Sequence, residues 1–160
     1  MTNQCFKPGF LLLAILLAGL LASCAPGAAD QAPVELITLE RAPCFGTCPV
    51  YTLSIHGDGT VEYNGLDFVE VTGPQTATID PAAVQALGDA MAEAGYFDWQ
   101  DAYLDYQVTD LPYATSSVTL SDGTTKRIEH YYGDSSAPEA LTELETLIDE
   151  TANTQQWIGD

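Results

Sequence analysis

Two cysteines near the start of the chain have the spacing of a structural crosslink. Cys44 and Cys48 are separated by three residues, whereas a redox-active pair usually has two and stands at the start of a helix. Here Pro49 and an apolar run follow, which is typical of a strand. In an exported protein such a pair usually becomes a disulfide. We therefore expect Cys44 and Cys48 to be crosslinked at the corner between the first two strands.

A zinc site is the competing interpretation of the same cysteines. Structural zinc takes four cysteine or histidine ligands, and His56 and His130 are the only histidines that could join the pair. Each histidine lies alone in a predicted strand, where a hydrogen-bonded structural role is more common than a ligand role. The disulfide is the favoured alternative, and we expect no metal and no cofactor.

The amino terminus predicts export and a lipid anchor. Lys7 precedes an apolar stretch at residues 10–21, the pattern of a secretory signal that is too short for a permanent span of about 20 residues. The stretch ends in Leu-Ala-Ser-Cys, which resembles the lipobox of bacterial lipoproteins. We expect residues 1–23 to be removed and Cys24 to carry the acyl chains, palmitate included, that anchor the protein. Ala25 after the cysteine favours the outer membrane, facing the periplasm.

The mature chain is expected to combine a short tether with one strongly acidic domain. Residues 24–33 are small residues, Pro and Gly with nothing to bury, whereas residues 34–160 suit a single domain with one core. Three Lys and Arg remain against 23 Asp and Glu, a formal charge of −20. Such a surface repels phosphate backbones, which excludes nucleic acid as a partner. A basic partner protein or a cation-rich habitat would match this charge.

An irregular stretch rich in aspartate and tyrosine is the candidate binding loop. Its residues are Asp101, Tyr103, Asp105, Tyr106, Asp110 and Tyr113. A loop that packs its tyrosines into the core is the competing interpretation. The spacing of the aspartates lacks the alternating oxygen ligands of a calcium loop.

The alternative function is a small hydrolase-like enzyme that uses His130 with Asp105 or Asp110 for acid–base chemistry. Neither histidine lies in a nucleophile motif, so no catalytic residue is assigned. A third alternative is sequestration of calcium by the acidic surface.

Period-two patterns predict the strands that hold these residues. Strands are expected at residues 34–41, 49–56, 60–63, 66–71, 114–120 and 124–132, and residues 76–79 are a candidate for one additional short strand. Asn64-Gly65 predicts a tight hairpin turn, and a break in the alternation between Phe68 and Val69 predicts a bulge.

Two helices are predicted from their ends and from apolar spacing. Asp80-Pro81 starts the first and Gly95 ends it, with Val84, Leu87, Met91 and Ala94 on one side. The second covers residues 138–152, with a stripe of Leu141, Leu144, Leu147, Ile148 and Thr151, and Trp157 and Ile158 are expected to fold back over the core. The prediction is an α+β fold of order β-β-β-β-α-β-β-α, an antiparallel β-sheet with two helices packed on one face.

The run Cys44-Phe45-Gly46-Thr47-Cys48-Pro49-Val50-Tyr51 resembles the signature of a bacterial family of unknown function, DUF6438. The Gly-Asp-Gly-Thr-Val turn at residues 57–61, Phe68-Val69 with Gly73, and Thr109-Asp110-Leu111-Pro112 extend the resemblance, which covers about residues 36–148. Members of this family are often exported or lipid-anchored. The resemblance implies the domain and supplies no catalytic residues. We expect a non-catalytic module that binds an envelope protein or ligand at the periplasmic face of the outer membrane.

Overall fold

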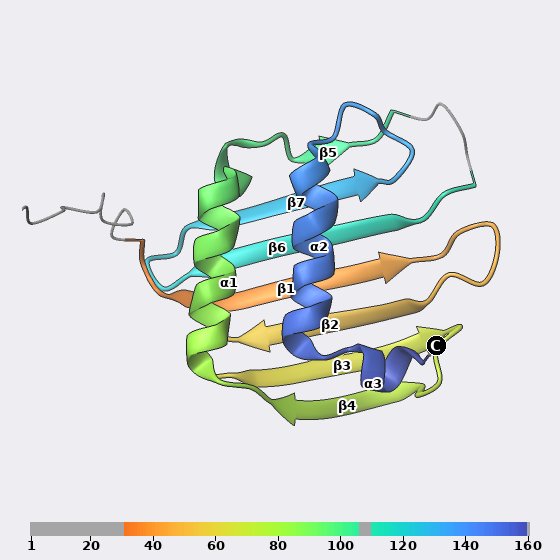
Figure 1. The fold of residues 1–160 in the computed structure, drawn as a ribbon, viewed down its shortest axis with the longest axis horizontal. Coiled ribbons are helices and arrows are strands. Elements are labelled where there is room, and N and C mark those ends of the chain that lie inside the picture. Colours follow the sequence, from red (N-terminus) through yellow and green to blue (C-terminus); the bar gives the residue numbers. More distant parts are fainter. Residues whose placement is uncertain (1–30, 106–109, 160) are drawn as a thin grey trace, which may run out of the picture.

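The computed structural model describes residues 31–105 and 110–159, which form a sheet with helices on one face (Figure 1). The strands are β1 (Val34–Ala42), β2 (Val50–His56), β3 (Thr60–Asp67), β4 (Gly73–Thr78), β5 (Ala102–Tyr103), β6 (Tyr113–Leu120) and β7 (Thr125–Tyr131). The helices are α1 (Pro81–Ala94), the 3-10 turn η1 (Tyr96–Asp98), α2 (Glu139–Ala152) and the short α3 (Gln155–Ile158). The predicted α+β class is confirmed, with η1, β5 and α3 as three short elements that were not expected.

The strands lie in the order β4-β3-β2-β1-β6-β7-β5. Each pair of neighbours is antiparallel except β5, which runs parallel to β7. Because antiparallel neighbours run in opposite directions, β1, β3 and β7 end where β2, β4 and β6 begin. We call this the disulfide end of the sheet, because the β1–β2 loop there contains both cysteines. It lies on the right of Figure 1, opposite the start of β1.

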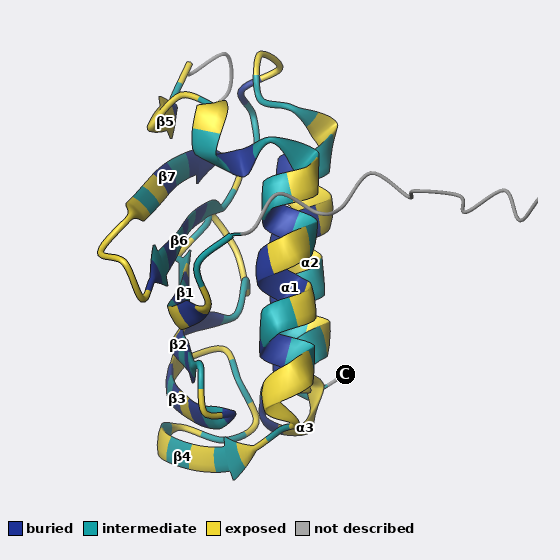
Figure 2. Ribbon diagram, turned by 90° about the vertical axis from the view of Figure 1, so that its left-hand side faces the viewer, coloured by how far each residue is buried: buried dark blue, intermediate teal, exposed yellow. Residues whose placement is uncertain are grey.

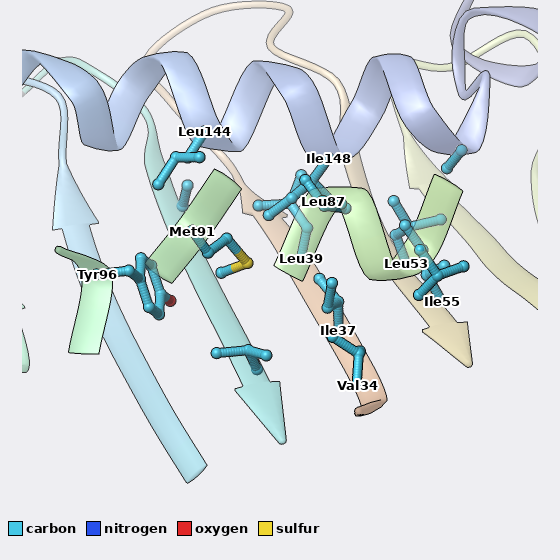
Figure 3. Close-up of a cluster of buried hydrophobic side chains, with 14 of the residues drawn as sticks. Val34, Ile37, Leu39, Leu53, Ile55, Leu87, Met91, Tyr96, Leu144 and Ile148 are labelled. Atoms are coloured by element: carbon cyan, nitrogen blue, oxygen red, sulfur yellow. The ribbon is translucent and has the colours of Figure 1, made fainter. Parts of the chain in front are cut away.

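The core lies between the helices and one face of the sheet. Alternate residues of the central strands, such as Ile37, Leu53 and Ile55, point toward α1 and α2 and are fully buried (Figure 3). The other face of the sheet has no helix over it in the described residues (Figure 2). That face carries hydroxyl side chains, and those of Thr38 and Ser117 are hydrogen-bonded to each other at 2.6 Å. The period-two pattern therefore separates an apolar face from a polar one.

The predicted ends of α1 are confirmed. A carboxylate oxygen of Asp80 accepts a hydrogen bond from the amide of Ala82 at 2.8 Å, and Pro81 occupies the first turn. Gly95 has a φ of 87°, and its amide bonds to the last carbonyls of the helix. Gly88 in the middle of α1 has a different role, because a Cβ there would lie 2.2 Å from Val34 Cγ2. The helix can approach β1 closely only with glycine at this position.

The Asn64-Gly65 hairpin and the bulge after Phe68 were predicted wrongly. β3 continues through both residues to Asp67, and one strand, β4, replaces the two strands predicted at residues 66–71 and 76–79. Gly65 is needed for close packing, since a Cβ there would lie 2.2 Å from a backbone carbonyl oxygen. Phe68, with a φ of 51°, supplies a left-handed residue for the turn instead. The irregularity in strand pairing lies elsewhere, between Val50 and Tyr51 of β2, where the register with β3 shifts.

The second helix buries a different stripe from the one predicted. Leu141, Leu144 and Ile148 are buried as expected, whereas Leu147 and Thr151 are only partly buried. Glu145 and Ala152 complete the buried face. After the helix, Trp157 in α3 folds back as predicted, and its ring stacks on Tyr63 with 4.9 Å between ring centroids.

The predicted signal at residues 1–23 and the acylated Cys24 lie outside the described residues. At the end of the predicted tether, Ala32 packs against the core and the carbonyl of Pro33 accepts a hydrogen bond from Ser121 at 2.8 Å. No helix in residues 31–105 and 110–159 is long and apolar enough to cross a membrane.

Candidate functional site

Cys44 and Cys48 form a disulfide, as predicted, with 5.8 Å between their Cα atoms. The ring they close lies between the end of β1 and the start of β2. The amide of Phe45 inside this ring donates to the carbonyl of Asp110 at 3.3 Å, which joins the ring to the segment before β6. The aromatic side chain of Phe45 is 87% exposed. The crosslink thus presents an apolar ring to solvent from a constrained loop.

Arg41 lies at the end of β1 and joins the sheet to α2. Its Nε and Nη2 donate to Asp149 Oδ2 at 3.3 and 2.8 Å, and Nη2 also donates to the carbonyl of Glu145 at 3.2 Å. Tyr51, the last residue of the family-like motif, donates to the other oxygen of Asp149 at 2.7 Å. Arg41 and Asp149 are mostly buried, each with 17% of the side chain exposed. The pair is therefore held by charge and by several hydrogen bonds.

Glu145 carries the network deeper, to β7 and the residue that follows it. Its side chain is completely buried, and Oε2 accepts a hydrogen bond from the hydroxyl of Tyr132 at 2.6 Å. Both carboxylate oxygens lie 3.2 Å from His130 Nδ1. Arg41 Nη1 in turn donates to the hydroxyl oxygen of Tyr132. Because Glu145 and Asp149 are four residues apart on α2, one helix face supplies both carboxylates.

Burial and neighbouring charges shift the pKa values of Arg41, Tyr51 and Tyr132 in this network. Burial alone would lower the pKa of Arg41, but Tyr132, Asp149 and Tyr51 outweigh it and raise that pKa above its ordinary value. Burial, followed by the charge of Asp149, raises the pKa of Tyr51 far above its usual range. Burial, followed by Glu145, does the same for the pKa of Tyr132. At neutral pH the guanidinium is charged and both phenols are donors.

Two hollows adjoin this network. The apolar pocket has a volume of about 210 Å³ and is lined by Arg41, Ala42, Cys48, Pro49, Tyr51, Pro112, Tyr113, Tyr132 and Ile158. The acidic hollow has a volume of about 440 Å³ and is lined by Thr146, Asp149, Glu150, Asn153, Thr154, Gln155 and Ile158. Ile158 of α3 lines both, so the two hollows are neighbours.

Large exposed apolar side chains gather at the disulfide end. Among the described residues they are Phe45, Leu66, Phe68 and Leu111. Phe45 lies in the loop before β2, and Leu111 lies just before β6. Leu66 lies at the end of β3, and Phe68 follows that strand. Single exposed apolar residues are ordinary, but four of them share this one end of the sheet.

The residues of the predicted binding loop have different environments. Asp101 is exposed and pairs with Lys126 at 2.6 Å, whereas the ring of Tyr103 is buried. The amide of Asp105 donates to Asp134 at 2.9 Å. Tyr106 lies outside the described residues. Asp110 and Tyr113 lie at the disulfide end, where Asp110 contacts Phe45 and Tyr113 lines the apolar pocket.

The two histidines lie on opposite faces of the sheet. His56 contacts Glu62 at 3.2 Å on the face without helices, and His130 contacts Glu145 on the helix side. The sulfurs of Cys44 and Cys48 bond to each other. The four residues considered for zinc are thus apart, and the described residues contain no group of three or more His, Cys, Asp or Glu arranged to hold a metal.

The network around Arg41 was missed in the sequence. Arg41 and Asp149 are 108 residues apart, and no local pattern joins them. A signal was present in α2, where Glu145 falls between the apolar Leu144 and Ile148. A carboxylate on the apolar face of an amphipathic helix requires a buried partner, and Arg41 is one of only four Lys and Arg in the sequence.

Comparison with known proteins agrees with the resemblance seen in the sequence. A family model described as a domain of unknown function (DUF6438) matches residues 35–152, which include the disulfide, Arg41 and both carboxylates of α2. No curated protein matches the chain.

Proposed function

The chain belongs to the DUF6438 family, and we propose that it is an envelope lipoprotein whose domain is a non-catalytic binding module for another envelope protein. In this proposal a lipid on Cys24 anchors the chain in the outer membrane, and the domain faces the periplasm. The observation that carries the binding role is the group of exposed apolar side chains at the disulfide end, Phe45, Leu66, Phe68 and Leu111.

The disulfide supports this role because it prepares the loop for binding. A loop that must become ordered on association loses part of the interaction free energy. The Cys44–Cys48 bond and the hydrogen bond from Phe45 to Asp110 restrict the loop before any partner arrives. An exposed phenylalanine on a constrained loop is a suitable anchor for a protein interface.

The position of the tether supports a protein partner rather than the membrane surface. Gln31 is seven residues after Cys24, a distance of at most about 25 Å when extended. β1 has nine residues and is about 30 Å long, and the disulfide end lies at its far end. If that end pointed into the membrane, the tether would have to be almost fully extended to reach the lipid, which a flexible chain disfavours. The disulfide end is therefore free to meet a partner in the periplasm.

Site-specific photocrosslinking in cells tests the binding role. With p-benzoylphenylalanine in place of Phe45, we expect a discrete crosslinked protein. The same group in place of Ser121, which is exposed in the β6–β7 turn at the opposite end, is the matched control and should give none. Equal crosslinking from both positions, or none from Phe45, would contradict the proposal.

The anchor is tested separately. Mass spectrometry of the mature protein should find an acylated amino-terminal Cys24, and a Cys24→Ala chain should no longer fractionate with the outer membrane. A mature protein with an unmodified thiol at Cys24 would rule out the lipoprotein assignment.

A further inference from the structure

We propose that the disulfide end binds a polypeptide segment carrying an apolar side chain next to a positively charged one. The apolar side chain enters the apolar pocket, and the lysine or arginine enters the acidic hollow. This inference rests on the proposed binding function and names the chemistry of its partner.

The size of the apolar pocket favours one side chain over a free small molecule. Pockets for small ligands usually have volumes of about 300–1,000 Å³. This pocket has about 210 Å³, and the disulfide-bonded Cys48, two prolines and three tyrosines contribute to its lining. Such a lining, closed on one side by the crosslinked loop that carries the exposed Phe45, matches the way in which a buried anchor residue is held at a protein interface.

The charges around the pocket select a cation. Arg41 lines the pocket, but its charge is balanced by Asp149 at 2.8 Å, with Glu145 at 3.9 Å. Glu150 adds an exposed carboxylate to the acidic hollow. Asp67 and Asp110, both exposed, are neighbours in sequence of the exposed apolar residues. A basic group on the partner therefore meets favourable charge from several directions.

The other basic residues of this chain do not neutralise the carboxylates near the two hollows. In the mature chain Lys126 and Arg127 are the only Lys or Arg besides Arg41. Both lie near the start of β7, at the end of the sheet away from the pocket, and pair with Asp101 and Glu129. Of the three cations of the mature chain, only Arg41 therefore lies near the pocket, and Asp149 balances its charge.

The same charge disfavours the other occupants of the surface. A second copy would bring another formal charge of −20 to the interface. Anionic lipid headgroups would be repelled as well, and the tether would have to be almost fully extended to bring the disulfide end to the membrane. A basic and apolar segment of another protein is the occupant that satisfies both hollows.

Fluorescence anisotropy with three labelled hexapeptides tests the inference on the mature chain in nonionic detergent, with empty micelles as the blank. The probes are Gly-Phe-Lys-Phe-Lys-Gly, its charge-reversed form with glutamate for lysine, and its polar form with serine for phenylalanine. We expect the first probe to bind at least tenfold more tightly than the other two at low salt. An equal affinity for the first probe and either control would overturn the inference.

Two variants locate the binding. Glu150→Lys should weaken the first probe at least tenfold, whereas Glu143→Lys, an equal charge change at an exposed site on α2 outside both hollows, should not. Ala42→Phe fills the apolar pocket and should also weaken binding, with an unchanged melting temperature as evidence that the fold is intact. Equal losses from Glu150→Lys and Glu143→Lys would reveal diffuse charge attraction and would reject the assigned site.

The outcomes separate this inference from the proposed function. If the Phe45 crosslink forms in cells but the peptides do not rank as expected, the module binds a partner by other chemistry and the inference fails. If the peptides rank as expected but the Phe45 position gives no crosslink, the site chemistry stands and the cellular binding role fails.

Discussion

Replacement of Arg41 by methionine should destabilise the domain more than any comparable loss of a surface charge. The substitution keeps much of the side-chain volume but removes the cation that holds Asp149 and lies near the buried Glu145. Loss of one partner from a buried ion pair costs about 3–5 kcal/mol. Because Arg41 and Asp149 each remain 17% exposed, we expect a loss near the lower bound, about 3 kcal/mol.

Urea denaturation measures this loss, with tryptophan fluorescence as the signal. Trp157 is buried and stacked on Tyr63, so its emission should report unfolding of the core. With a slope of about 1.5 kcal/mol per molar urea, a loss of about 3 kcal/mol lowers the midpoint by about 2 M. This is a large part of a total stability of roughly 5–15 kcal/mol.

Arg127→Met is the matched control. Arg127 pairs with Glu129 at 2.5 Å, but their side chains are 54% and 43% exposed, so the loss should be below about 1 kcal/mol. In the Arg41→Met background, Asp149→Asn should cost less than it does alone, because the two residues act as one unit. Equal midpoints for Arg41→Met and Arg127→Met, together with additive effects of Arg41→Met and Asp149→Asn, would refute the role given to the network.

Three further changes test the fold and its pH dependence. Replacing both Cys44 and Cys48 by serine should lower the free energy of unfolding by about 2 kcal/mol, which is the loop-closure value for so small a ring. An unchanged urea midpoint would contradict this. Gly88→Ala should cost about 1–3 kcal/mol, because the new methyl group would collide with Val34; a more stable variant would show that α1 can shift. Burial, and after it the neighbouring carboxylate of Asp149, raise the pKa of Tyr51 above its unfolded value of about 10. The neutral phenol therefore stabilises the fold below pH 10, and this stability is lost as the pH rises further. Urea midpoints between pH 8 and 11 should therefore fall less steeply in Tyr51→Phe than in the parent, and parallel slopes would exclude this contribution.

Local features of the fold were predictable because each depends on neighbouring residues. The Asp80-Pro81 start and Gly95 end of α1 satisfy the free backbone groups of that helix alone. The alternation in β2 separates a buried face from an exposed one within a single strand. The Cys44–Cys48 disulfide spans only four positions in sequence, so its partner was also local.

Turn prediction failed where tertiary contact outweighed local preference. Asn64-Gly65 has the composition of a hairpin turn, yet β3 continues through it because Gly65 packs against the backbone near Val71. A glycine is needed both in a turn with positive φ and where another backbone approaches closely, and the sequence of Asn64-Gly65 does not distinguish the two cases. The parallel pairing of β5 with β7 likewise depends on a sheet edge that is formed by a later part of the chain.

The sequence by itself determined the class of the fold, the helix ends, the disulfide and the family, since these follow from local sterics, periodicity and a short motif. Only the tertiary structure decided what lies beside that disulfide. Sheet order places the end of β1 next to the start of β2 and β6, and the crossing of α2 brings Glu145 and Asp149 over it. Arg41 thereby meets carboxylates more than a hundred residues away. Contacts of that range depend on how whole elements pack, and local patterns carry no record of them.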